Sequence, residues 1–315
     1  MCLNVQPLSD DLVKHVYETV EAKYKNLGEK KYKRFTHIKG VYNMALFLAK
    51  KYHVDLHKVA ICALLHDYYK YEDEETMASF LSEEEIKECK ECRALYHAYA
   101  SSKQLKLLFG IDDKEMENAI KYHVFGHPNM TKLEEIIVIA DYTEENREYL
   151  DCIKCREILL SGHFNEAIYY STLKTIEQLK RTKRNPHPMQ LEVLYEYERK
   201  IQMDKVKVVL EALQKVNASE IVCYNTDEKS PFFNHVLVAS VDSVRQLNAS
   251  LDYIKEKLAE AGFMVKNTTG ANSEWVIVDA CDLLVHVFFK EERERFQIDK
   301  LYMDSPVVDL SNIVE

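Results

Sequence analysis

The spacing of apolar side chains divides the sequence into two parts of different character. From residue 10 to about residue 200, apolar positions recur every three or four residues, which is the spacing of amphipathic helices. Beyond about residue 217, short runs rich in β-branched residues replace this pattern and predict strands. These runs are EIVCYN (220–225), HVLVASV (235–241), WVIVDA (275–280) and LLVHVFF (283–289).

We therefore expect an all-α N-terminal domain, residues 1–200, and a small α/β (α+β) domain with a mixed sheet, residues 204–315. Helical patterns cover residues 204–216, 242–261 and 291–300 of the second domain. The boundary falls in YERKIQMDK (197–205), which has no Pro, Gly or Ser and so favours a helical connection. A length of 315 residues also suits two domains.

Histidines and aspartates interrupt several of the predicted apolar faces. The apolar run VAICALL (59–65) ends in a His-Asp pair, and three other helical patterns each carry one such residue on their apolar face. These residues are His37, His66, Asp67, His123 and Asp141. A lone histidine in such a place is more often a hydrogen-bonded core residue than a ligand. Several together need another explanation.

Burial of an unpaired carboxylate costs several kcal/mol, so groups of this kind are expected to be buried together with a partner. A shared metal ion is the simplest partner for several imidazoles and carboxylates at once. Nitrogen and oxygen ligands without thiolates suit iron, manganese or zinc, and favour iron or manganese.

Two CxxC pairs offer an alternative metal site of the zinc-ribbon type. They are Cys89/Cys92 and Cys152/Cys155. The gap between the pairs is far longer than in zinc ribbons, and both pairs lie within helical patterns that lack turn residues. We therefore interpret the eight scattered cysteines as reduced thiols of a cytoplasmic protein.

Charge and hydropathy argue against two classes of partner. The net charge of −10 disfavours binding to free DNA, because phosphate contacts need a basic surface. One basic cluster, KRTKR (180–184), is an exception whose simplest interpretation is a solvated helix end. No stretch is apolar enough to span a membrane, and the N-terminal MCLNVQPLSDD lacks the features of a signal peptide.

The order of the candidate ligands resembles the H…HD…D signature of the HD-domain phosphohydrolases, in which four ligands surround one metal ion. Two additional histidines resemble those of the members that bind two metal ions. The matching positions are His37, His66, Asp67, His97, His123 and Asp141. The flanking segments RFTHIKGVYNMALFLAKKY, ALLHDYYK, AIKYH, ADYTEENR and NPHP are similar to those of the YqeK type, the symmetrical diadenosine tetraphosphate hydrolases, over about residues 9–197.

This resemblance implies two divalent or mixed-valence metal ions, iron or alternatively manganese, held by those six residues. Asp67 would bridge the ions and act in catalysis, and the products would be two molecules of ADP. Lys70 and Arg147 follow the HD and ADY motifs, where they would neutralise polyphosphate charge or else form ordinary surface ion pairs. Family members often carry Arg where His127 stands, so His127 is also a candidate for substrate binding.

The second domain resembles the ribosomal silencing factors, the RsfS or Iojap-related family. The matching segments are SVRQLNASLDYIKEKLAEAG (243–262), EWVIVDACDLLVHVFF (274–289) and ERERFQIDKLY (292–302). The resemblance implies a small mixed α/β fold that binds a protein of the large ribosomal subunit and hinders subunit joining. An acidic chain suits a basic ribosomal protein.

The sequence thus predicts a cytoplasmic enzyme that hydrolyses diadenosine tetraphosphate and carries a ribosome-binding domain. Two alternatives remain open. The HD domain would act on another nucleotide, or the chain would be mainly a ribosome-binding module with a weak metal site.

Overall fold

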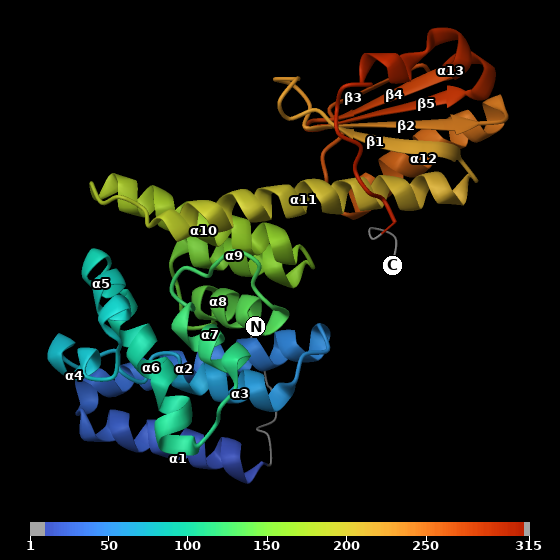
Figure 1. Ribbon diagram of the computed structural model, residues 1–315. Coiled ribbons are helices and arrows are strands. Elements are labelled where there is room, and N and C mark those ends of the chain that lie inside the picture. The colour runs from blue at the N-terminus through green and yellow to red at the C-terminus, as the bar shows by residue number, and fades with distance from the viewer. Residues whose placement is uncertain (1–9, 312–315) are drawn as a thin grey trace. The chain divides into compact units, whose positions relative to one another are not determined.

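The computed structural model describes residues 10–311, which form two compact units that divide between Glu198 and Arg199 (Figure 1). The first unit is helical, and the second combines a mixed sheet with helices, so both expected fold classes are confirmed. Helix α11 (Pro188–Lys215) contains the division and runs through residues 197–205. Within residues 10–311, no helix has both the length and the apolarity that a membrane crossing requires.

The helices of the first unit follow one another with short connections. Their bounds are α1 (Asp11–Asn26), α2 (Glu29–Lys51), α3 (Leu56–Leu65), α4 (Glu74–Ala78), α5 (Glu83–Glu91), α6 (Leu95–Phe109), α7 (Lys114–Lys121), α8 (Lys132–Thr143), α9 (Leu150–Leu160) and α10 (Phe164–Arg181). Helix α8 begins with the expected capping box, in which Thr131 and Glu134 bond to each other's backbone amides.

Helix α3 is the centre of this unit. Every residue from Val59 to Leu65 is buried, and a helix that is apolar all round is typical of a position inside a core. It packs against α1, α2, α6, α7 and α8. Asp55 caps its N-terminus, and His66 occupies its C-cap. The apolar sequence of α3 therefore carries the chain into the interior and leaves Asp67 there, with no exposed surface.

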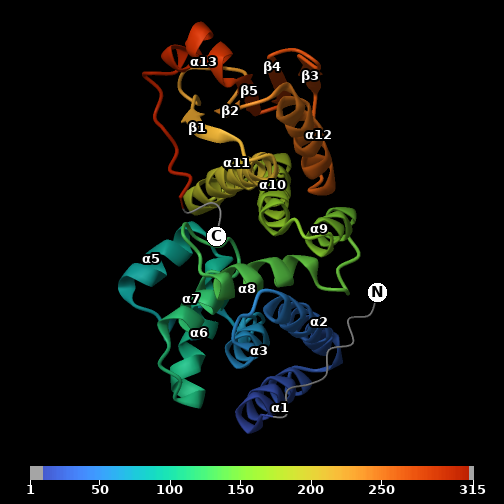
Figure 2. The same cartoon turned by 90° about the vertical axis from the view of Figure 1, so that its right-hand side faces the viewer.

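The second unit is built on a five-stranded sheet in the order β1-β2-β5-β4-β3 (Figure 2). Its strands are β1 (Ser219–Asn225), β2 (His235–Val241), β3 (Asn267–Thr269), β4 (Trp275–Ala280) and β5 (Leu283–Phe289). Strands β2 and β5 are parallel and the other neighbours are antiparallel. The four apolar strands lie where the sequence predicts them, whereas the short edge strand β3 has the polar sequence NTT, which carries no strand signal.

Two different layers cover the sheet. Helix α12 (Val244–Glu260) packs its apolar residues on one face, against Val276, Val285 and their neighbours. On the other face, the Trp275 ring stacks on Phe288 with centroids 4.7 Å apart. Helix α13 (Lys290–Phe296) ends at Gln297, whose φ of 52° is left-handed, and a 3₁₀ turn η1 (Ile298–Leu301) follows. The helix predicted over 291–300 is therefore interrupted.

One buried histidine makes the stability of the second unit depend on pH. The Trp275 indole donates a hydrogen bond to Nδ1 of His286 at 3.2 Å, and burial lowers the pKa of His286 from 6.5 to about 4. An unfolded chain takes up a proton near pH 6.5 that the folded unit resists, so stability falls as the pH drops through this window.

We expect the free energy of unfolding to fall by about 2 kcal/mol more in the wild type than in His286→Asn between pH 7 and about pH 4.5. Asparagine retains a hydrogen-bond acceptor but does not titrate in this range. The chain has a single tryptophan, Trp275, so its fluorescence during urea unfolding reports on this unit alone. If the free energy of unfolding fell equally with pH in both proteins, His286 would not be the group that makes stability depend on pH.

Candidate metal centre

The helices of the first unit bring all six predicted ligands to one place. His37 lies on α2, His97 on α6 and Asp141 on α8, while the remaining ligands directly follow the ends of α3 and α7. Five of the six side chains are buried: His37, His66, Asp67, His97 and His123. The rings form a chain, because the centroids of His66 and His123 are 5.0 Å apart and those of His97 and His123 are 5.2 Å apart.

Asp67 is shared by two groups of potential ligand atoms. One group contains His37, His66 and Asp67, and the other contains Asp67, His97 and His123; within each group the atoms lie within 4.8 Å of one another. Nε2 of His66 is 3.4 Å from Oδ2 of Asp67, and Nε2 of His97 is 3.1 Å from Oδ1. Each oxygen of the carboxylate therefore faces a different pair of imidazoles.

Asp141 extends the first of these groups. Its Oδ1 lies 3.0 Å from Nε2 of His37 and 4.0 Å from Nε2 of His66. A second carboxylate beside the first pair of imidazoles gives that group two nitrogen and two oxygen donors, while the second group has two nitrogen donors and one oxygen donor.

Two backbone carbonyls fix which ring nitrogen of His66 and of His123 faces the centre. Nδ1 of His66 lies 2.7 Å from the Ala63 carbonyl, and Nδ1 of His123 lies 2.8 Å from the Ile120 carbonyl. Since a carbonyl only accepts hydrogen bonds, these Nδ1 atoms carry the proton, and Nε2 presents its lone pair to the centre.

Several of the central atoms are left without a hydrogen-bond partner. Nε2 of His37, Nε2 of His66 and Oδ1 of Asp67 are buried and make no hydrogen bond of acceptable geometry. Such orphaned groups are expensive unless something neutralises them. Lone pairs that converge from imidazoles and carboxylates fit a cation, so the residues present suit a divalent metal site.

The charge state of the groups also suits metal binding. Burial lowers the pKa of His97, and burial together with the nearby His66 and His97 places the pKa of His123 well below its usual value. Burial would raise the pKa of Asp67, but the charges of His66 and Arg34 hold it well below its usual value. His97 and His123 therefore present neutral imidazoles and Asp67 an ionised carboxylate, which are the forms that bind metals. At His37, hydrogen bonds to Asp141 and Glu144 outweigh burial and raise the pKa.

Two of the three predicted substrate-binding side chains lie beside this centre. Nζ of Lys70 is 3.0 Å from Nε2 of His97 and 3.6 Å from Oδ1 of Asp67. Nη2 of Arg147 donates to Oδ1 of Asp141 at 2.7 Å. His127 pairs instead with Glu134, at 3.1 Å, and its other ring nitrogen lies 2.8 Å from the Pro128 carbonyl.

The sequence did not reveal two residues that hold the ligands in place. The guanidinium of Arg34 forms an ion pair with Asp67, and Oε1 of Glu144 lies 3.2 Å from Nδ1 of His37. Arg34 lies three positions before His37, and Glu144 lies three positions after Asp141. A search for charged residues one helical turn from each ligand would have found both.

The cysteine pairs take no part in this centre. Cys89 is buried next to α6, and both Cys152 and Cys155 are buried within α9. Burial raises the pKa of the Cys89 thiol to about 12, which disfavours the thiolate that zinc needs. Among residues 10–311, the groups that could hold a metal ion contain no cysteine.

Comparisons with known proteins agree with this geometry. The family model of the HD domain matches residues 34–146, and the model described as ribosomal silencing factor during starvation matches residues 189–315. A Bacillus subtilis (strain 168) protein named symmetrical bis(5'-nucleosyl)-tetraphosphatase is 32% identical over 145 residues, or 45% of this chain and 77% of that protein. Ribosomal silencing factor RsfS of the same organism is 32% identical over 106 residues, or 33% of this chain and 90% of that protein.

The chain belongs to both families. The HD domain also resembles a crystal structure from Clostridium acetobutylicum, described as a predicted HD superfamily hydrolase involved in NAD metabolism. The identity is 31%, the TM-score is 0.52, and the match covers 58% of this chain and 97% of that one. Membership confirms the predicted class, an HD hydrolase joined to a silencing-factor domain.

Metal analysis of purified variants tests the two ligand groups. We expect about two metal ions per wild-type chain, about one in His97→Ala, and almost none in Asp67→Asn, because Asp67 belongs to both groups. His57→Ala is the matched control, since His57 is exposed and lies outside the centre. A variant of Asp67 that retains both ions would contradict the shared-ligand arrangement.

Proposed function

We propose that the HD domain hydrolyses diadenosine tetraphosphate to two ADP in the cytoplasm, with two bound ions of iron or, alternatively, manganese. The observation that supports this proposal is the shared carboxylate of Asp67, which faces one pair of imidazoles with each of its oxygens. His37, His66, Asp67 and Asp141 would hold one ion, and Asp67, His97 and His123 the other.

Two such ions lower the pKa of water and offset the negative charge of a phosphoryl group. The chain's own residues supply the remainder of the site. Arg34 neutralises and orients Asp67, and Glu144 fixes the ring of His37. These contacts keep the ligands in position before any ion or substrate arrives, which is the preorganisation that a catalytic centre needs.

The basic side chains favour a substrate with phosphates on both sides of the bond that is cleaved. Lys70 lies beside the second ligand group, through His97 and Asp67, and Arg147 lies beside the first, through Asp141. Each of the two ligand groups therefore has a basic side chain of its own beside it. A polyphosphate that crosses the centre would meet positive charge at either side, which suits cleavage in its middle.

A second substrate class is favoured by one comparison. The similar structure from Clostridium acetobutylicum is described as involved in NAD metabolism. The alternative for this chain is thus another nucleotide, such as a dinucleotide with a shorter phosphate bridge. Separation of the products distinguishes these possibilities.

Incubation of the iron- or manganese-loaded protein with diadenosine tetraphosphate is expected to yield ADP alone. Asp67→Asn should lower kcat by roughly a thousandfold or more, because both ions depend on this carboxylate. His57→Ala should retain wild-type activity, as its exposed side chain is outside the centre. ATP together with AMP would contradict symmetrical cleavage, and hydrolysis only of other nucleotides would favour the alternative.

We also propose that the silencing-factor domain binds a protein of the large ribosomal subunit and hinders subunit joining. Apolar side chains at the C-terminal end of the domain support this role. Phe296, Leu301 and Met303 are 50%, 72% and 73% exposed, and Phe296 adjoins the aromatic cluster of Trp275 and Phe288. Neighbouring exposed apolar residues of this kind mark a protein-binding surface.

The full-length protein is expected to co-sediment with large ribosomal subunits at low and moderate salt. Leu301→Glu should weaken this association by about tenfold or more, because a charge would be buried at the interface. Met264→Glu is the matched control, since Met264 is 67% exposed and follows α12 rather than η1. An equal effect of both substitutions would show that the surface at η1 is not the binding site.

A further inference from the structure

A second cavity of the HD domain has a strongly basic wall. Its volume is about 530 Å³, and it lies between α9, α10 and the segments next to them. Four basic side chains line it: Arg147, Lys174, Arg181 and Arg184. Two tyrosines, Tyr142 and Tyr149, and one acid, Asp151, line it as well.

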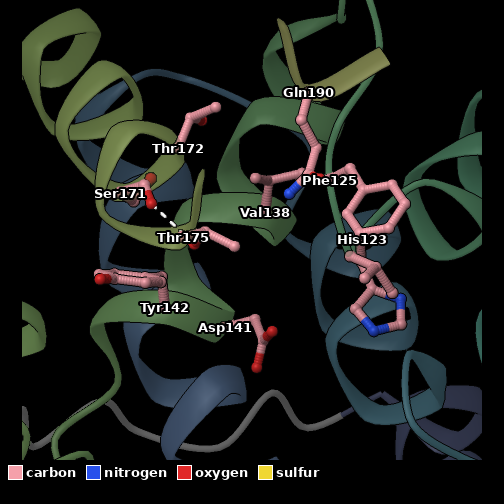
Figure 3. Close-up of a pocket in the computed structure, with 10 residues that line it drawn as sticks. His123, Phe125, Val138, Asp141, Tyr142, Ser171, Thr172, Thr175 and Gln190 are labelled. Carbon is pink, nitrogen blue, oxygen red and sulfur yellow. Dashed lines mark hydrogen bonds between the residues drawn. The ribbon is translucent and has the colours of Figure 1, made fainter. Parts of the chain in front are cut away.

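A smaller cavity shares wall residues both with this cavity and with the metal centre. The smaller cavity, of about 40 Å³, has His123 and Asp141 in its wall (Figure 3). Tyr142 and Thr175 line both cavities. In addition, Arg147 lines the large cavity while its guanidinium bonds to Asp141 at 2.7 Å. The basic wall therefore lies next to the metal centre.

Two of the basic groups are not neutralised by the protein. Within residues 10–311, neither Arg181 nor Arg184 forms an ion pair: Arg181 bonds to the side-chain amide of Gln178, and Nε of Arg184 donates to the Thr182 hydroxyl at 3.1 Å. Lys174 is paired with Glu177 on the same helix. In a chain with a net charge of −10, unpaired guanidinium groups around a cavity favour an anionic ligand.

An aromatic side chain next to these charges suits a nucleobase. Tyr149 is 75% exposed and lines the cavity at the start of α9. A large exposed ring gains little from water, whereas stacking on a base is worth about 1–3 kcal/mol. Charged groups for phosphates and a ring for a base thus occur in one cavity.

We propose that this cavity binds the second nucleoside diphosphate half of the substrate, the half that leaves when the bridge is cut in its middle. The inference rests on the proposed function, because symmetrical cleavage requires a nucleoside diphosphate on each side of the metal centre. It also gives part of the KRTKR cluster a role. Arg181 and Arg184 bind phosphates, whereas Lys180 and Lys183, which do not line the cavity, remain solvated.

Two double variants with the same change in charge test this assignment in the full-length, metal-loaded protein. Arg181→Gln with Arg184→Gln should raise KM for diadenosine tetraphosphate about tenfold and leave kcat within about twofold, since it removes two phosphate contacts but no metal ligand. Lys180→Gln with Lys183→Gln is the matched control and should leave both constants unchanged. Tyr149→Ala should also raise KM.

Binding supplies a second readout that does not depend on turnover. Equilibrium dialysis of diadenosine tetraphosphate against chelator-treated protein should show the same loss of affinity in the arginine variant and none in the lysine variant. Equal effects of the two double variants would overturn the proposal, because general electrostatic attraction would explain them. If only the arginine variant lost affinity but the wild type formed no ADP, the proposed function would be overturned. The cavity would then still be assigned as a nucleotide-binding site.

Discussion

The burial of Asp67 is the constraint on which the HD domain depends. An apolar helix, α3, carries this carboxylate to a position with no exposed surface, where Arg34 and the surrounding imidazoles hold its pKa well below the usual value. A charge in such a place is costly unless it is paired and hydrogen-bonded. The helices α2, α6, α7 and α8 each bring a ligand or a supporting group to it. The same packing of helices around α3 therefore also assembles the metal centre.

Sequence reasoning found five of the ligands because each breaks a local pattern, whereas His97 was found only through the family resemblance. A histidine or carboxylate on an apolar face is visible in the sequence, and the flanks of the HD pair resemble those of the YqeK type. The contacts that surround the ligands are a different matter: helical spacing can single out Arg34 and Glu144 as candidates, but it does not reveal which groups they bond. The role of Glu144 depends on a contact with His37, which is 107 positions away in the sequence. The hydrogen bonds to the carbonyls of Ala63 and Ile120 involve the backbone, which is the same at every residue, so the sequence does not mark them. Likewise, β3 was missed since its partner strand, and not its own polar sequence, makes it a strand.

Local charge, and not net charge, decides where an anion binds. The chain carries ten more acidic than basic charges, yet Lys70, Arg147, Arg181 and Arg184 are gathered around the metal centre and the cavity beside it. Lys70 and Arg147 are partly buried, so their charges are screened less than those of solvated surface acids, which are screened within about 10 Å. The overall acidity thus opposes indiscriminate binding of nucleic acid and is compatible with the proposed binding of a polyphosphate beside the metal centre.

The covalent connection gives the two domains a fixed ratio. The Bacillus subtilis relatives of the two domains are separate proteins, each covered over most of its length by its own part of this chain. Here α11 contains the division between the units, so the connection is helical and contains no glycine or proline between residues 189 and 215. A ribosome that binds the silencing-factor domain therefore also carries one HD domain. The proposed nucleotide hydrolysis and the proposed subunit binding would thus be linked in this chain by stoichiometry.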